Sequence, residues 1–384
     1  MRAASGVRAV TVARLLLSAY FFTPYIVVYA VGLGIPLSQI LVVEGIFALL
    51  VVVLEIPSGW VADRITPRVA LILSGVANVV GCVMLAMADA AWMYWAVQPV
   101  FAVATVLGSG SDSALLLQTL RREGRTEQFE PWESRTQSLL LATLAISYAL
   151  ASALFLLGGT ASTFWGTAAA SLLGVMLVSM VSTGGGKQTG EQHQTMGLVR
   201  TIGLIVADLR QDPGQVRVLV AAVLTGTAFA VMTYLSPVYY GQAGFPESIF
   251  GLLAAATALA GAGISHLITG VHFGRALIFV LAVAAVLVSI PSAVVVVIAV
   301  AVLLGGRARA VGAYRRQLGQ ALSRHGDATG MSIASMAMEI GFAVLAPVLG
   351  VVSHLFGTTG LAATCAVMLV TAAVVSPTRV RTSA

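Results

Sequence analysis

The chain has 384 residues, of which 58% are hydrophobic and only 9% are charged. A soluble domain carries about 25% charged residues, so this composition excludes a soluble globular protein, and the mean hydropathy of +0.96 predicts a polytopic membrane protein. The net charge of +6 does not indicate a nucleic-acid partner, because the basic residues follow a membrane topology.

Twelve apolar runs follow one another along the chain, and we interpret each as a transmembrane helix. The basic residues before the first run suggest a signal peptide, but the run continues too far and lacks a cleavage site, so we predict an uncleaved helix. Short Gly-rich or Pro-containing connections separate several runs. The runs cover 10–32, 38–61, 69–88, 91–118, 136–158, 161–181, 217–240, 247–269, 275–290, 293–311, 329–354 and 359–376.

The distribution of basic residues predicts the orientation. With the N-terminus in the cytoplasm, all 21 Lys and Arg residues fall in or beside segments on the cytoplasmic side. Arg14 lies just inside the first run, and we expect its side chain to extend back to the inner surface. Both termini are therefore predicted to be cytoplasmic.

The longest polar stretch divides the runs into six and six. We predict an N-terminal six-helix bundle (1–182), a cytoplasmic linker (183–216) and a C-terminal six-helix bundle (217–384). Within the linker, the apolar spacing of 196–209 suits a short helix on the membrane surface, and a disordered linker is an equal alternative. Two cysteines, Cys82 and Cys365, lie in apolar runs and are expected to be packing residues rather than metal ligands or disulfide partners.

The segment 59–68 connects the second and third runs and reads Gly-Trp-Val-Ala-Asp-Arg-Ile-Thr-Pro-Arg. It resembles the signature loop of the major facilitator superfamily, Gly-x-x-x-Asp-Arg-x-Gly-Arg-Arg, and departs from it at Thr66 and Pro67. Two further stretches, 109–125 and 327–332, are similar to other runs of bacterial members, although Asp327 stands where the family has arginine.

This resemblance implies a gate on the cytoplasmic side. Gly59 would let the second helix approach a neighbour closely, and Asp63 would face the positive end of another helix. Arg64 and Arg68 would reach acids or helix ends. Two acids near the same side complete the predicted gate motif, namely Glu55 and Asp112.

Four acids lie inside apolar runs, where a charge costs about 2.5–3.5 kcal/mol and therefore needs a reason. Glu339 stands near mid-membrane, where a carboxyl group that exchanges a proton is what proton coupling requires. We predict proton coupling at Glu339 and Asp112; the alternative is that each holds helices together. Glu44 is close enough to the outer end to reach water, and Glu55 is assigned to the gate.

The first helices of the two halves carry several aromatic residues, and the resemblance implies that these helices line the substrate cavity. The predicted cavity residues are Tyr20, Tyr25, Tyr234, Tyr239, His266 and Glu339. Aromatic walls suit a partly apolar solute. The alternatives are an aromatic belt at the membrane surface for the tyrosines and a packing role for the histidine.

We therefore predict an all-α major facilitator fold that acts as a secondary transporter by alternating access. Proton-coupled export of a hydrophobic or amphipathic small molecule is the first hypothesis; import of a small organic solute and a non-transporting sensor or scaffold are the alternatives. No nucleotide-binding or catalytic signature is present, so no enzyme activity, cofactor or metal is expected. The expected partners are the solute, protons and the lipid bilayer, without nucleic acid, for a monomer in a bacterial plasma membrane.

Overall fold

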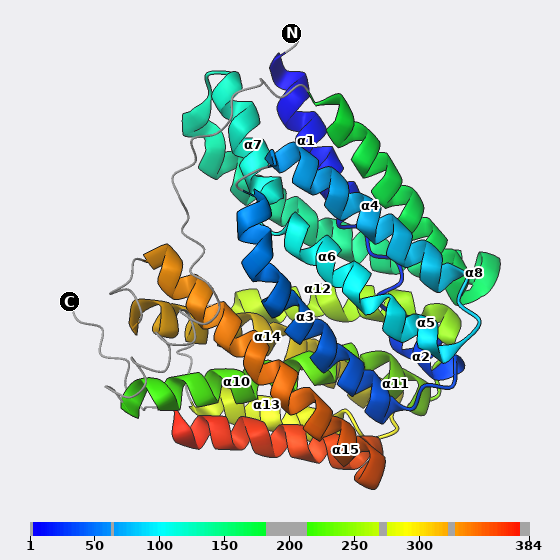
Figure 1. Ribbon diagram of the computed structural model, residues 1–384. Helices are drawn as coiled ribbons and strands as arrows, with labels where there is room; N and C mark the ends of the chain where they lie inside the picture. Colours follow the sequence, from blue (N-terminus) through cyan, green and yellow to red (C-terminus); the bar gives the residue numbers. More distant parts are fainter. Residues whose placement is uncertain (1–2, 63–64, 182–212, 269–274, 322–326, 377–384) are drawn as a thin grey trace. The chain divides into compact units, whose positions relative to one another are not determined.

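The computed structural model describes residues 3–62, 65–181, 213–268, 275–321 and 327–376, and within these ranges every regular element is helical (Figure 1). In chain order the elements are α1 (Ala3–Leu17), α2 (Ile26–Gly32), α3 (Leu37–Ala62), α4 (Pro67–Ala86), α5 (Ala91–Ala96), α6 (Gln98–Gly108), α7 (Ser111–Arg122), α8 (Phe129–Met180), α10 (Pro213–Tyr234), α11 (Ser236–Gln242), α12 (Phe250–Leu267), α13 (Arg275–Leu287), α14 (Ala293–Ala321) and α15 (Asp327–Val375), with short 3-10 turns at Thr126–Gln128 and Glu247–Ile249.

Most of the helices match apolar runs of the sequence. Eight helical stretches of the described part are long and apolar enough to cross a membrane. Two of them, α8 and α15, each contain two predicted runs, which are separated by glycines with positive φ at Gly159 (+65°) and Gly357 (+66°). Only glycine adopts this backbone conformation without strain, so the predicted chain reversals at these positions are confirmed.

The chain divides into two compact units. Unit 1 contains residues 1–29 and 53–196, and unit 2 contains residues 30–52 and 197–384. The helix α3 contributes its first half to unit 2 and its second half to unit 1. Most of the predicted linker, 183–216, lies outside the described residues, and α10 begins at Pro213.

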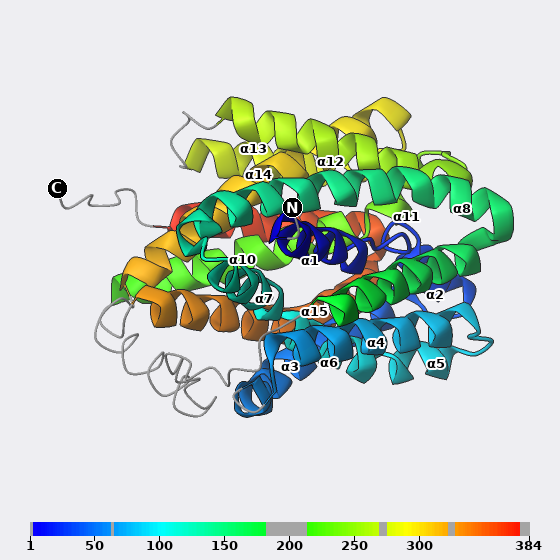
Figure 2. The same ribbon diagram turned by 90° about the horizontal axis from the view of Figure 1, so that it is seen from above.

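Small residues bring the helices of unit 1 close together. A Cβ atom on Gly75 of α4 would overlap Val175 of α8 and Leu17 of α1, and one on Gly174 would overlap Leu17 as well. Close packing of this kind is how membrane helices associate, because lipid supplies no hydrophobic drive between them. The same unit places α4 beside α6 and α8 (Figure 2).

The first predicted run is not one helix, which corrects the sequence-based expectation. Residues 18–25 are irregular and separate α1 from α2. Pro24 has no N–H to continue a helical ladder, and the backbone N–H of Phe21 instead donates to Thr167 Oγ1 of α8 at 3.0 Å. The fourth run is also interrupted, since Gly110, with φ of +74°, separates α6 from α7. Both interruptions lie in unit 1.

In unit 2, the first half of α3 packs tightly on α15. A Cβ atom on Gly45 would lie 3.0 Å from the Ala343 carbonyl oxygen and from Pro347 Cδ. A Cβ atom on Gly350 would overlap the Ser38 carbonyl. The two glycines therefore let the backbones of α3 and α15 approach each other along several turns.

Candidate functional site

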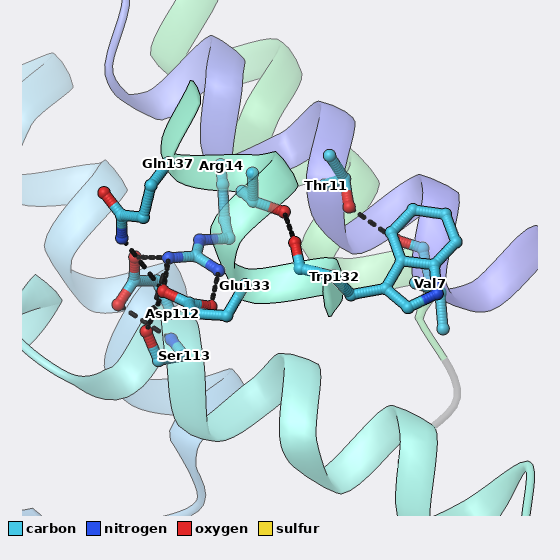
Figure 3. A network of polar contacts seen from close by, with 9 residues as sticks. Val7, Thr11, Arg14, Asp112, Ser113, Trp132, Glu133 and Gln137 are labelled. Carbon is cyan, nitrogen blue, oxygen red and sulfur yellow. Dashed lines mark hydrogen bonds and ion pairs between the residues drawn. The ribbon is translucent and has the colours of Figure 1, made fainter. Parts of the chain in front are cut away.

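The most strongly connected polar group of unit 1 is centred on Arg14 of α1 (Figure 3). Its Nη2 lies 2.7 Å from Asp112 Oδ2 of α7. Its Nη1 lies 2.7 Å from Glu133 Oε2 of α8, and Nη2 lies 3.0 Å from Oε1 of the same carboxylate. The Arg14 side chain is 1% exposed, so the expectation that it extends to the membrane surface is wrong: two acids compensate its charge inside the unit instead.

The two carboxylates differ in how many donors hold them. Besides Arg14, Glu133 accepts hydrogen bonds from Ser113 Oγ and Gln137 Nε2, each at 2.9 Å. Asp112 accepts, besides the contact with Arg14, the backbone N–H of Ser113 at 2.8 Å. Glu133 therefore has more hydrogen-bond donors around it than Asp112 has.

The break before α7 positions Asp112. Gly110 turns the chain with a positive φ, and α7 starts at Ser111. Asp112 therefore falls in the first helical turn, where the helix dipole attracts an anion. Its side chain is 29% exposed and that of Glu133 is 21% exposed, so both carboxylates are accessible while the arginine between them is not.

The charges of this group do not balance. With both acids ionised, one arginine and two carboxylates give this three-residue group one net negative charge. A proton on one carboxyl group would make the group neutral and would still leave Arg14 an ionised partner. In either state the buried cation keeps a carboxylate partner, whose loss would be costly.

Glu44 is also held by a specific partner. Its Oε1 accepts a hydrogen bond of 2.6 Å from the Tyr234 hydroxyl, which links α3 to α10 within unit 2. The expectation that Glu44 simply reaches water is therefore replaced by a defined contact. It also places Tyr234, a predicted cavity residue, at a helix–helix contact in which its side chain is half-buried.

Removing the Tyr234 hydroxyl should destabilise the protein measurably. Tyr234→Phe leaves the Glu44 carboxyl group without this donor, and a buried polar group that loses its hydrogen bond costs about 1–3 kcal/mol. Tyr25→Phe is the control within unit 1, where the Tyr25 hydroxyl pairs with Ser152 Oγ at 3.2 Å. We expect a fall in thermal unfolding midpoint for Tyr234→Phe at least as large as for Tyr25→Phe; an unchanged midpoint in Tyr234→Phe would contradict a stabilising contact with Glu44.

Glu339 is exposed on a face of α15 that otherwise packs inward. The exposed apolar side chains Val344, Val348 and Val351 form a stripe along the helix. With 3.6 residues per turn, Glu339 lies on the opposite side, in line with the buried Ala346. Glu339 therefore lies away from the stripe of exposed apolar side chains, and its role in coupling stays a prediction.

The remaining predicted cavity residues separate into two groups. Tyr25 and Tyr239 are buried and their hydroxyls pair inside their own units, with Ser152 and with the Thr358 carbonyl. His266 lies on the same exposed face of α12 as Leu259, which is 61% exposed. We therefore leave these three out of the proposed solute site.

Tyr20 lies at the break between α1 and α2 and is 37% exposed. Its ring meets Phe22 edge-on at a centroid distance of 5.9 Å. Phe22 in turn stacks on Phe101 of α6 and Phe164 of α8, at 5.8 and 5.3 Å. The irregular segment therefore ends in an aromatic cluster, of which Tyr20 is the accessible member.

The structure describes only part of the gate motif. Arg68 donates to the carbonyl of Ser179, in the last turn of α8, where helix carbonyls lack helical partners. Glu55 is half-buried in the second half of α3. Gly59 lies within α3, but Asp63 and Arg64 lie outside the described residues. The proposed role of the motif thus stays a prediction.

Sequence reasoning missed Glu133. Its position three residues before the fifth predicted run placed it among the loop residues. The available signal was Arg14, since an arginine inside an apolar run requires a counter-charge. Glu133 and Gln137 are one helical turn apart, so this polar pair could have been examined as a partner of Arg14.

Comparisons with known proteins identify the family of this chain. The family model of the Major Facilitator Superfamily matches residues 15–314. Among solved structures, the nucleoside transporter NupG is similar with a TM-score of 0.75 and 13% identity, over 97% of this chain and 98% of that one.

Two further solved structures have the same fold. A POT family transporter in complex with 5-aminolevulinic acid gives a TM-score of 0.70 and 13% identity, covering 96% of this chain and 95% of its own. A D-xylose-proton symporter gives 0.64 and 14%, with the same coverage. No curated protein matches the sequence. At such identities these likenesses show the fold alone.

Proposed function

Because the chain belongs to the Major Facilitator Superfamily, a family of multi-pass membrane transporters rather than enzymes, we propose that it couples the movement of a small organic solute to protons. In this proposal two six-helix bundles, 1–182 and 217–384, alternate access to the solute across a bacterial plasma membrane, with both termini in the cytoplasm. The monomer suffices for this mechanism.

One observation carries the proposal: the buried Arg14 paired with both Asp112 and Glu133. A permanent excess charge is costly at membrane depth. Protonation of one carboxyl group removes that excess, and release of the proton restores it. A group that changes its charge in this way can make the conformational change depend on the proton gradient.

Asp112 is the proposed proton carrier of this group. It has fewer donors than Glu133 and is the more exposed of the two carboxylates. Glu133, held by four hydrogen bonds, would remain ionised and keep Arg14 compensated. Glu339 of unit 2 is a second proposed coupling site, because it is exposed on the inward face of α15.

The proposed solute is hydrophobic or amphipathic. The exposed ring of Tyr20, backed by Phe22, Phe101 and Phe164, offers the flat apolar surface on which such a molecule stacks. Export is the proposed direction. An amphipathic molecule that partitions into the membrane enters without a transporter, so a transporter is needed to move it outward. Import of the same solute would use the same residues and differs only in the sign of net flux.

The test starts with purified protein and a panel of amphipathic metabolites and antibiotics. Compounds that raise the thermal unfolding midpoint are then loaded into proteoliposomes, and exchange of labelled for unlabelled compound is measured. We expect saturable exchange that falls with Tyr20→Ala and persists in Tyr25→Ala if that variant folds. Stabilising compounds that bind without any exchange would contradict transport and favour a sensor.

A further inference from the structure

A groove on the surface of unit 2 runs between α13 and the last part of α15, which lie side by side (Figure 1). It has a volume of about 390 Å³ and is lined by Arg275, Ala276, Phe279, Val370, Ala373 and Val374. Phe279 and Val374 are 60% and 68% exposed. The groove thus combines apolar walls with a single charged side chain.

Arg275 is held in place by the end of α15. Its Nε donates to the Ala373 carbonyl at 3.1 Å. Since α15 ends at Val375, this carbonyl is among the last four of the helix, which have no helical partner. The contact explains why the side chain turns toward α15.

This capping contact uses only part of the guanidinium group. Nη1 and Nη2 carry four further N–H donors, and neither forms a hydrogen bond with the described residues. Their fork matches two oxygens of a phosphate group. An acyl chain of the same lipid would lie along the apolar side chains of Phe279, Val370 and Val374.

The place of Arg275 on α13 favours such a ligand. It is the first described residue of this apolar helix and lines the groove beside Ala276 and Ala373. A basic side chain at the end of an apolar membrane helix extends toward the headgroups, where anionic lipids attract it.

We propose that this groove is a binding site for an anionic phospholipid, with the phosphate on Nη1 and Nη2 of Arg275 and one acyl chain between α13 and α15. An anionic lipid is favoured over a zwitterionic one because the latter carries its own ammonium group, which cancels the net charge that Arg275 attracts. The site is independent of the proposed transport activity.

The test uses the full chain, delipidated in detergent, with dioleoylphosphatidylglycerol and dioleoylphosphatidylcholine as probes. Lipid adducts are counted by native mass spectrometry, and the lipid-induced rise in unfolding midpoint is measured. We expect phosphatidylglycerol to bind more tightly than phosphatidylcholine, and Arg275→Gln to weaken its binding about fivefold, since a basic residue near the membrane surface contributes about 1 kcal/mol.

Two variants separate the lipid site from the helix cap. Val374→Phe fills the groove but keeps Arg275 and its contact with Ala373, and it should also weaken phosphatidylglycerol binding. Arg217→Gln removes an exposed charge near the start of α10, outside the groove, and should not. For each variant, the lipid-induced rise is the unfolding midpoint with lipid minus the midpoint of the same variant without lipid. Equal binding of the two lipids, or unchanged phosphatidylglycerol binding in both groove variants, would overturn the proposal.

Discussion

Replacing Arg14 with glutamine is expected to lower the free energy of unfolding by about 1.5–3 kcal/mol, because hydrogen bonds to charged groups contribute this much and both carboxylates lose their shared partner. Here two carboxylates, Asp112 and Glu133, would be left facing each other. The expected observation is a large fall in thermal unfolding midpoint in detergent, or loss of the folded protein from the membrane fraction.

Two matched variants make this result specific. Arg125→Gln removes an arginine that pairs with Glu123 at 2.9 Å and is 30% exposed, against 1% for Arg14, so its loss should cost less. Arg14→Lys keeps the charge but loses the fork that contacts both carboxylates, so its effect should lie between the other two. If Arg14→Gln were as stable as Arg125→Gln, the group would not be a buried structural element.

Replacing Asp112 with asparagine is expected to abolish proton-driven accumulation while leaving solute exchange intact. Asparagine can still accept the Ser113 N–H, but it cannot bind a proton at this position. A gradient of one pH unit can drive about tenfold accumulation for each coupled proton, and this accumulation should vanish in Asp112→Asn. The measurement compares exchange with gradient-driven uptake in the same proteoliposomes.

Glu133→Gln is the informative companion of Asp112→Asn. Since Glu133 supplies the two-oxygen contact to Arg14, its replacement should lower stability more than Asp112→Asn does. Glu339→Gln tests the second proposed coupling site in the same assay. If Asp112→Asn accumulates solute normally and Glu339→Gln does not, proton coupling is assigned to Glu339 of unit 2 instead of Asp112 of unit 1.

Much of the fold could be predicted from the sequence, because membrane helices are marked by continuous apolar runs and by the placement of basic residues. The turns at Gly159 and Gly357 were predictable as well, since glycine marks the reversals. The breaks inside the first and fourth runs were not. Most of residues 18–25 are apolar or aromatic, and the Phe21 N–H is satisfied by Thr167, a partner distant in sequence.

The candidate site was predictable only in part. Asp112 was identified because an acid in an apolar run is costly, but Glu133 was not, because it precedes the apolar run of its helix. Tyr25 and Tyr239 illustrate the other limit: Tyr25 lies in the irregular segment before α2 and Tyr239 on α11, and the burial of each depends on neighbours that sequence periodicity does not reveal.

The most direct test of proton coupling is the pH inside wild-type proteoliposomes after an exchangeable solute is added outside, with a pH-sensitive dye in the lumen and no imposed gradient. The proposal predicts a saturable change in luminal pH that a protonophore collapses and that Asp112→Asn lacks; its sign distinguishes exchange of solute for protons from movement in the same direction. Solute exchange with no change in luminal pH would contradict proton coupling.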